Sequence, residues 1–385
     1  MWWGNILALL IAAAVGLVGY RLRIPGGMML GAMLGVIVFN VLTGAVDFPV
    51  QARAISQSLV GGVIAMSITR EFVRSLRTFI KSAVVLAICM MISGLVIGFT
   101  LYGLNLIDDL ATSLFASAPG GVADMTLIAM EMGIDSSRVV TLHIIRLVSI
   151  IAICPQLYRM IVLRYYPPVS PEFVATAEGP EAEDSLPMGE PSHGGGGHAV
   201  AASASLSYPQ EGRFYEKAAW FIRKSTLTVI VAIAGGTVGF FIGVPAGVLI
   251  FSMAAVIIFN LATDKAYIPK NVRRFAQIIA GTIIGQSIGM DELADIAALI
   301  IPGMILVLIY ILLSIAIAFM IHRLCGLDLV TALFASAPGG ASDMALIADD
   351  IGGNSPIIAT MHIVRIVAVI IMFPQIIFFI LLFSG

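Results

Sequence analysis

Residues 114–125 read LFASAPGGVADM and residues 333–344 read LFASAPGGASDM, so a twelve-residue stretch occurs twice with two differences. The similarity continues in both directions along the chain. On the C-terminal side, at a constant offset of 219, identical residues recur for Thr141, His143, Arg146, Pro155 and Gln156. On the N-terminal side, at an offset of 220, they recur for Pro25, Asn40, Arg53, Gln57, Gly61 and Ser67. The chain therefore consists of two copies of one unit, and this repeat decides its architecture.

The composition indicates a protein of the lipid bilayer. Of the 385 residues, 59% are hydrophobic and only 11% are charged, which no soluble domain of this length requires. Each copy has five apolar segments long enough to cross roughly 30 Å of hydrocarbon. They are residues 3–20, 25–43, 53–69, 79–102 and 137–162 in the first copy, and 225–242, 245–263, 273–290, 298–321 and 356–383 in the second. We expect an all-α polytopic membrane protein.

The segment between the copies has a different composition. Residues 164–218 contain two adjacent prolines, an acidic run and four consecutive glycines, and they are too polar to form an apolar core. We interpret them as a disordered cytoplasmic linker. The linker would separate a first membrane repeat, residues 1–163, from a second, residues 219–385.

Charge and cysteine spacing argue against several classes of function. The net charge is −2 and no basic block is present, so we expect no nucleic-acid partner. The three cysteines lack the spacing of metal ligands, and we expect no metal, no cofactor and no enzymatic activity. The expected partners are the lipid bilayer and a small-molecule substrate. The sequence leaves open whether the chain forms a homodimer.

The loop charges orient the two copies in opposite directions. Lys and Arg favour cytoplasmic loops. In the first copy they follow the first and third spans, at Arg21, Arg23 and residues 70–81, whereas the second copy is basic at 265–274 and acidic at 291–295. We expect inverted repeats in a bacterial inner (plasma) membrane, with both termini periplasmic. If the APGG segment crossed the membrane instead of re-entering from one side, the copies would be parallel.

The APGG sequence predicts a broken helix, or re-entrant hairpin, in each repeat. Pro119 removes a backbone donor and disfavours helix just before it, whereas Gly120 and Gly121 allow a ligand to approach the backbone. The next helix would present free N–H groups and a positive dipole end to an anion. The alternative is a structural hairpin with Asp124 as a first-turn dipole partner. It gives no reason for the near-identity of the two stretches.

A second recurring pair lies inside the last apolar span of each copy. His143 and Arg146 are three residues apart, so both side chains share one helix face. Because charge within a span is costly, we expect Arg146 to pair with Asp124 or with Asp343, and Arg365 likewise. One alternative is a closed ion pair that locks the hairpin. For the histidines, a hydrogen bond to a carbonyl is the alternative to a proton relay.

The predicted binding site combines both copies. Its substrate- and ion-binding residues are Ser117, Pro119, Gly120, Gly121, Asp124, His143, Arg146, Ser336, Pro338, Gly339, Gly340, Asp343, His362 and Arg365. Polar residues that recur on other spans, such as Asn40 and Gln57, are expected to hydrogen-bond between helices. Glu131, Asp349 and Asp350 are interpreted as unmatched residues at the membrane interface.

The repeated LFASAPGG-x-x-DM, followed by H-x-x-R and Pro-Gln, resembles the AbrB-duplication membrane protein family. Members are also labelled AbrB family transporters or regulators, or ammonia monooxygenases. The resemblance covers both copies and implies the broader cation/proton antiporter and anion transporter fold group, with inverted repeats, broken helices and often elevator-like movement. A membrane monooxygenase is not expected, because no carboxylate–histidine cluster surrounds His143 or His362.

The sequence and the resemblance together lead to one expectation and one alternative. We expect a secondary transporter for a small organic anion or an amino acid, coupled to protons or Na⁺. The alternative is an integral-membrane sensor that affects gene expression indirectly.

Overall fold

A computed structural model of the chain describes residues 2–22, 27–165, 211–290, 296–339 and 351–384, together with 344, 345, 347 and 348. Every regular element in these residues is a helix, which confirms the all-α prediction for this part of the chain. The predicted linker lies mostly outside the described residues. The helix before it ends at Tyr165 and the next one begins at Glu211.

The helices follow the same order in both copies, except that the described residues of the second copy give no helix with bounds that match α6 and have an extra 3-10 turn. The first contains α1 (Trp2–Arg21), α2 (Gly27–Thr43), α3 (Val50–Ala65), α4 (Arg70–Gly103), α5 (Leu110–Ala116), α6 (Val122–Glu131) and α7 (Ser136–Tyr165). The second contains α9 (Glu211–Ile242), α10 (Gly247–Thr263), α11 (Lys270–Gly285), the 3-10 turn η1 (Ile296–Leu299), α13 (Ile300–Cys325), α14 (Leu329–Ser336) and α16 (Ser355–Ser384). All ten apolar segments predicted from the sequence coincide with helices of this order.

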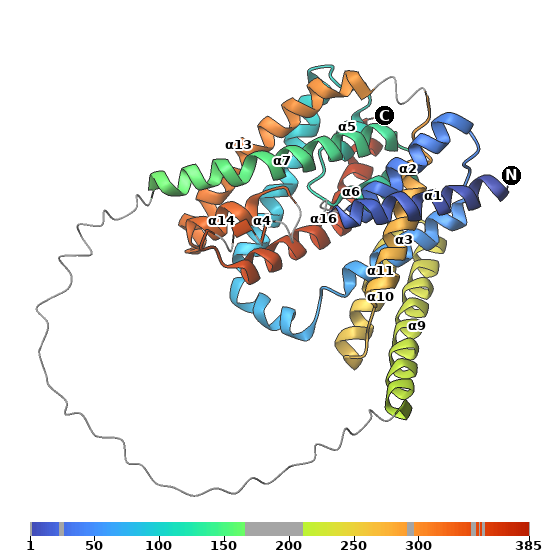
Figure 1. The fold of residues 1–385 in the computed structure, drawn as a ribbon. Coiled ribbons are helices and arrows are strands. Elements are labelled where there is room, and N and C mark those ends of the chain that lie inside the picture. The colour runs from blue at the N-terminus through green and yellow to red at the C-terminus, as the bar shows by residue number, and fades with distance from the viewer. Residues whose placement is uncertain are drawn as a thin grey trace, which may run out of the picture.

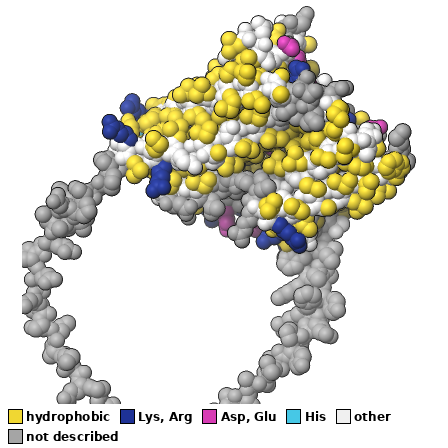
Figure 2. Space-filling view, turned by 45° about the horizontal axis from the view of Figure 1, so that its top comes forward, with side chains coloured by type: hydrophobic (Ala, Val, Ile, Leu, Met, Phe, Trp, Pro, Cys, Tyr) yellow, Lys and Arg dark blue, Asp and Glu magenta, His cyan; other side chains and the backbone are white. Residues whose placement is uncertain are grey.

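The apolar helices indicate a multi-pass membrane protein. Within the described residues, six helices (α1, α4, α7, α9, α13 and α16) are long and apolar enough to cross a membrane. Two others, α3 and α11, have 16 residues each and end before the predicted limits of their segments. At 1.5 Å per residue they reach about 24 Å, less than the thickness of the hydrocarbon core. Figure 2 shows a broad apolar surface, with Lys and Arg gathered in a few places at its edges.

The helices form two groups by their packing contacts, and in Figure 1 α9 and α10 of one group lie on the other side of the molecule from α13 and α14 of the second. The flanking group consists of α1, α2, α3, α9, α10 and α11. The hairpin group consists of α4, α5, α6, α7, α13, α14 and α16. In the flanking group the copies are interleaved, because α2 packs on α11 and α3 packs on α10. Across the boundary, α6 contacts both α3 and α11.

Glycines allow the helices of the flanking group to approach one another closely. A Cβ atom on Gly61 of α3 would lie 2.7 Å from the carbonyl oxygen of Leu249 in α10. A Cβ atom on Gly281 of α11 would lie 2.5 Å from the carbonyl oxygen of Met29 in α2. Since Gly61 and Gly281 are equivalent in the repeat, the same close packing of small residues occurs twice with exchanged partners.

Two asparagines connect the same helix pairs. Asn40 of α2 donates to the carbonyl oxygens of Gln286 and Ile288, which follow α11. Asn260 of α10 donates to the carbonyl oxygen of Ile68, which follows α3, at 3.1 Å. The prediction that these recurring asparagines hydrogen-bond between helices is therefore confirmed.

Replacing Gly281 by alanine tests the close packing of α11 on α2. We expect Gly281→Ala to lower stability by about 1–3 kcal/mol, because the added methyl group overpacks the contact. Thermal unfolding of the detergent-solubilised protein measures the effect. The matched control is Gly103→Ala at the end of α4, where a Cβ atom would have no heavy atom within 4 Å. Equal melting of the two variants would contradict the packing argument.

Candidate functional site

Each hairpin begins at an aspartate that caps its first short helix. The carboxylate of Asp109 accepts a hydrogen bond from the backbone N–H of Thr112 at 2.8 Å, at the start of α5. Asp328, the equivalent residue, accepts from the N–H of Thr331 at 2.7 Å, at the start of α14. In the first copy α5 ends at Ala116 and α6 begins only at Val122, so the helix is broken at the APGG sequence as predicted.

The short helix α5 runs back along α4. Ser113 donates from Oγ to the carbonyl oxygen of Gly98 at 2.6 Å. Further along α5, the carbonyl oxygen of Ser117 lies 2.9 Å from the position of a Cβ atom on Gly94. Later residues of α5 thus contact earlier residues of α4, and the two helices are antiparallel.

Arg146 and His143 of α7 bind carbonyl groups at and just before the break. The guanidinium donates to the carbonyl oxygens of Ala118 and Gly120, the latter at 2.8 Å. His143 Nε2 lies 2.9 Å from the carbonyl oxygen of Phe115, and Nδ1 lies 2.9 Å from Arg146 Nη2. Because arginine can only donate, Nδ1 accepts, and the neutral histidine carries its proton on Nε2. The order of these contacts makes α5 and α7 parallel.

The second copy repeats the contacts with carbonyl groups, but His362 Nδ1 is buried without a hydrogen-bond partner among the described residues. Arg365 donates to the carbonyl oxygens of Ala337 and Gly339, at 2.6 and 3.2 Å. His362 Nε2 lies 2.9 Å from the carbonyl oxygen of Phe334. The arginine and histidine side chains of both copies are buried. For the histidines, this geometry matches the carbonyl-bonded alternative rather than an open proton relay.

The expected ion pair between Arg146 and Asp124 is not formed. Asp124 is the third residue of α6, and its carboxylate lies against Gly121, where the positive end of the helix dipole stabilises it. Free carbonyl groups at the break, rather than a carboxylate, therefore receive the guanidinium of Arg146. Gly340 and Asp343 lie outside the described residues, and pairing with Asp343 stays a prediction.

The glycines of the motif provide space rather than an unusual backbone conformation. Gly121 has a φ of −74°, which any residue can adopt. A Cβ atom on Gly120 would lie 2.7 Å from Met125 Cγ, and one on Gly339 would lie 2.9 Å from Met344 Cε. In both copies the methionine of the motif occupies the space next to the first glycine. A larger residue at the glycine position would collide with it.

The serines and prolines of the motif also have structural contacts. Ser117 Oγ donates to carbonyl oxygens of its own helix, and Ser336 Oγ donates to the carbonyl oxygen of Ser314 at 2.9 Å. Pro119 packs on α4, and Pro338 is buried. The described residues at the two breaks, 117–121 and 336–339, are called the hairpin tips below, and the hydroxyl groups of both serines there already have acceptors.

Tyr310 of α13 belongs to the site although the sequence did not indicate it. Its hydroxyl donates to the carbonyl oxygen of Ser117, and the Arg146 Cζ atom lies 5.6 Å from the centre of its ring. Its counterpart in the first copy is Met90, so recurrence could not reveal it. The available signal was a lone tyrosine in a very apolar span.

Comparison with known proteins identifies the family. The family described as "Transition state regulatory protein AbrB" matches residues 1–162 and 190–380. The chain belongs to this family. The match in two blocks agrees with the duplication, and it confirms the resemblance inferred from the repeated motif.

Two relatives of this AbrB-family protein differ in coverage. "Putative regulator AbrB" of Escherichia coli (strain K12) is 23% identical over 382 residues, which cover 97% of this chain and 95% of the relative. "Uncharacterized protein YhjN" of Bacillus subtilis (strain 168) is 31% identical over 151 residues, or 36% of this chain and 38% of that protein. The first therefore matches both copies, whereas the second match covers about one copy.

Replacing Arg146 by lysine tests its role at the break. A lysine ammonium cannot reproduce the planar fork that binds two carbonyl groups, and one charged hydrogen bond contributes about 1.5–3 kcal/mol. We expect Arg146→Lys to melt at a lower temperature and to speed amide hydrogen exchange in residues 110–131. The control is Arg159→Lys, an exposed position on the same helix. Unchanged exchange in the hairpin of Arg146→Lys would show that the carbonyl contacts do not hold it.

Proposed function

We propose that this AbrB-family protein is a secondary transporter that carries a small organic anion or an amino acid across the bacterial inner membrane. The observation that carries the proposal is the pair of buried cations, Arg146 and Arg365, at the two hairpin tips. Among the described residues neither forms an ion pair with a carboxylate. Buried charge of one sign is costly, so an anion that reaches both guanidinium groups would be stabilised there.

Helix directions support an inverted repeat. In the hairpin group α7 runs parallel to α13, because Ile145 lies at Gly303 and Tyr158 hydrogen-bonds to Ser314 at 2.9 Å. Since α4 is antiparallel to α5, and α5 is parallel to α7, α4 and α13 run in opposite directions. These two are the equivalent helices of the two copies, so opposite directions are what inverted repeats require. The hairpins would then enter from opposite sides of the membrane.

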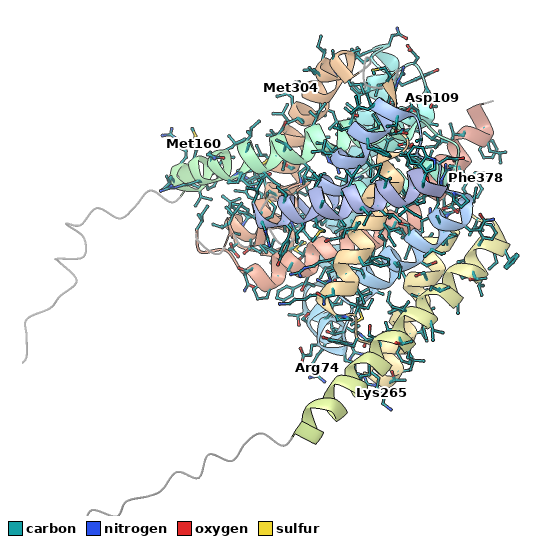
Figure 3. All side chains as sticks on the ribbon, turned by 45° about the vertical axis from the view of Figure 1, so that its right-hand side comes forward. Arg74, Asp109, Met160, Lys265, Met304 and Phe378 are labelled. Carbon is teal, nitrogen blue, oxygen red and sulfur yellow. The ribbon has the colours of Figure 1, made fainter. Side chains whose placement is uncertain are left out.

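The distribution of charge supports cytoplasmic basic loops. Arg70, at the start of α4, donates to the carbonyl oxygen of Leu261 at 2.9 Å, in the last turn of α10 just before the basic loop of the second copy. In Figure 3, Arg74 and Lys265 lie near each other at the lower end of the molecule, and Asp109 lies toward the opposite end. By the positive-inside rule, we propose that the lower end lies in the cytoplasm and both termini in the periplasm.

The two helix groups support an elevator-type movement. Both hairpin tips belong to the hairpin group, whereas the flanking group consists of helices interleaved between the copies. Movement of the first group along the second would expose the tips to each side of the membrane in turn. We assign the coupling ion, H⁺ or Na⁺, to Asp124, because His143 already accepts a hydrogen bond from Arg146.

The name of one relative favours a second candidate function. The E. coli protein is named "Putative regulator AbrB". A membrane sensor that binds a ligand at the same tips, and affects gene expression indirectly, would account for such a name. It differs from a transporter in one measurable respect, because it binds the ligand without moving it.

Cysteine labelling tests the inverted topology. In a background without native cysteines, we introduce Asp108→Cys before α5 and Arg323→Cys before α14, both at exposed positions. A membrane-impermeant maleimide added to intact cells should label Asp108→Cys and label Arg323→Cys only after permeabilisation. Labelling of both from the same side would show that the copies are parallel.

Flux in proteoliposomes tests transport itself. Radiolabelled lactate, succinate, glutamate and leucine are supplied under a proton or Na⁺ gradient, and we expect saturable uptake of at least one. Arg146→Ala should reduce that uptake to less than about a tenth, because removing one buried charged partner costs several kcal/mol. Asp124→Asn should uncouple uptake from the ion gradient, and Arg159→Ala is the matched control. Binding of these solutes with no flux would reject transport in favour of the sensor.

A further inference from the structure

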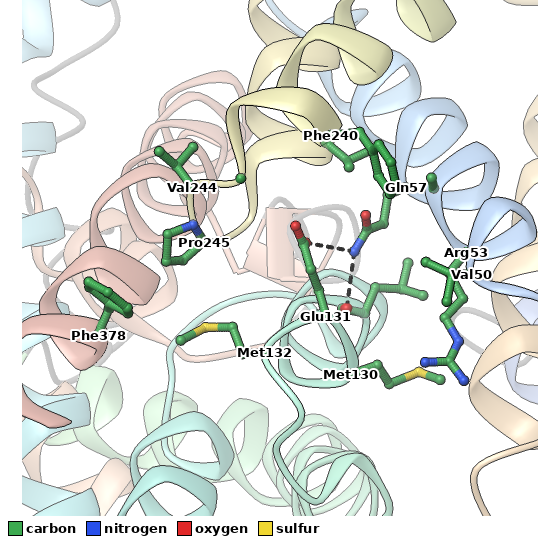
Figure 4. Close-up of a pocket in the computed structure, with 14 residues that line it drawn as sticks. Val50, Arg53, Gln57, Met130, Glu131, Met132, Phe240, Val244, Pro245 and Phe378 are labelled. Atoms are coloured by element: carbon green, nitrogen blue, oxygen red, sulfur yellow. Dashed lines mark hydrogen bonds between the residues drawn. The ribbon is translucent and has the colours of Figure 1, made fainter. Parts of the chain in front are cut away.

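A cavity of about 500 Å³ lies between the two helix groups, away from the hairpin tips (Figure 4). Its walls come from α3, α6, the connection between α9 and α10, and α16. Its volume lies within the range of roughly 300–1000 Å³ that is common for small-molecule sites. The apolar part of the wall consists of Met130, Met132, Phe240, Val244, Pro245 and Phe378.

The polar part of the wall is organised around Gln57. This side chain is buried, and its Nε2 donates to the carbonyl oxygen of Leu127 at 3.1 Å and to Glu131 Oε2 at 3.0 Å. Both bonds are drawn in Figure 4. They fix the carboxylate of Glu131 at the end of α6, where the exposed part of the group lines the cavity. One side of the cavity therefore offers a positioned negative charge.

Arg53 supplies the opposite charge. It lies four residues before Gln57 on α3, so both side chains share one face of that helix. The Arg53 Nε atom is buried and has no hydrogen-bond partner among the described residues. No ion pair joins Arg53 to Glu131 within the described part of the chain. The cavity thus holds a cation and an anion that are both present but not paired with each other.

The same residue types recur in the second copy. Arg53 and Gln57 fall on Arg273 and Gln277 at the offset of 220. Glu131 falls on Asp350 at the offset of 219, which corrects the interpretation that this acidic position has no match. Asp350 lies outside the described residues, so the repeat here is an observation on the sequence alone. It sets these three positions apart from the apolar residues around them, many of which differ between the copies.

We propose that this cavity binds a small zwitterion, namely an α-amino acid with an apolar side chain. The ammonium group would bind Glu131, the carboxylate would bind Arg53, and the side chain would pack against Met132 and Phe378. A ligand with only a negative charge would be repelled by the carboxylate of Glu131, and a ligand with only a positive charge would be repelled by the guanidinium of Arg53. Either would therefore bind less well. The site goes beyond the proposed transport function and does not depend on it.

Binding to the purified full-length protein in detergent tests this site, with three ligands of nearly equal shape. L-Leucine carries both charges, 4-methylpentanoate lacks the ammonium group, and 3-methylbutylamine lacks the carboxylate. We expect leucine to bind at least about tenfold more tightly than either, because each charged hydrogen bond contributes that much or more. Titration calorimetry measures the affinities without any gradient, so failure of the flux assay would leave this result unaffected.

Two variants connect the selectivity to the named residues. Glu131→Gln should remove the advantage of leucine over 4-methylpentanoate, and Arg53→Gln should remove its advantage over 3-methylbutylamine. Glu71→Gln, at an exposed position on α4, is the matched control and should keep the affinities of the unmodified protein. Equal binding of the three ligands, or selectivity that survives both substitutions, would overturn the proposal.

The headgroup of phosphatidylethanolamine has the same pair of charges and forms the second arm of the experiment. Native mass spectrometry with dioctanoyl phosphatidylethanolamine and phosphatidylcholine distinguishes a lipid from a free amino acid as the occupant. Binding of the first lipid alone, lost in both variants, would support a zwitterion site filled by lipid and would overturn the amino acid as its occupant. No binding of leucine or of either lipid would overturn the whole inference.

Discussion

A break in a helix inside a membrane requires hydrogen-bond donors that lipid cannot supply, and the hairpin group is arranged around this need. In the first copy, Ala118 and Gly120 lie between α5 and α6, so no continuing helix supplies donors to their carbonyl groups. Unsatisfied backbone groups are too costly to leave in hydrocarbon. Arg146 on α7 supplies the donors, and His143 adds a second one to the carbonyl group of Phe115. An arginine suits this position because its planar fork reaches two carbonyl groups at once.

The arginine at each break brings a buried positive charge that no carboxylate among the described residues pairs with. This charge connects the fold to the proposed function. Arg146 and Arg365 satisfy neutral carbonyl groups, so their positive charges are not cancelled by the contacts that hold them. The Nε atom of each guanidinium is buried and has no hydrogen-bond partner among the described residues. Tyr310 lies beside Arg146 and offers a polarisable ring and a hydroxyl, but no formal negative charge. An anion bound between the tips would neutralise the positive charge that the carbonyl contacts do not cancel.

Much of the fold could be predicted from the sequence, because a bilayer fixes the length of apolar segments and a duplication reveals each helix twice. Recurrence also identified Arg146 and His143, but it could not identify their partners. A charge pattern suggests a carboxylate as the partner of an arginine, and nothing in the sequence shows which carbonyl groups a break will leave free. Tyr310 was not predicted because its counterpart in the first copy is Met90, so the tyrosine does not recur. The helices α3 and α11 end earlier than predicted where they pack on helices of the other copy. The sequence of one segment contains no information about this packing.

The helix α6 connects the broken tip to the cavity beside α3. It begins directly after Gly121 and ends at Glu131, so the two sites lie at opposite ends of one rigid element of ten residues. Gln57 on α3 holds the far end through Leu127 and Glu131. The proposed movement of the hairpin group along the flanking group would break these two bonds. A ligand that bridges Arg53 and Glu131 would add a third connection between α3 and α6. Occupancy of the cavity would therefore oppose movement of the first tip, because both act on the same short helix.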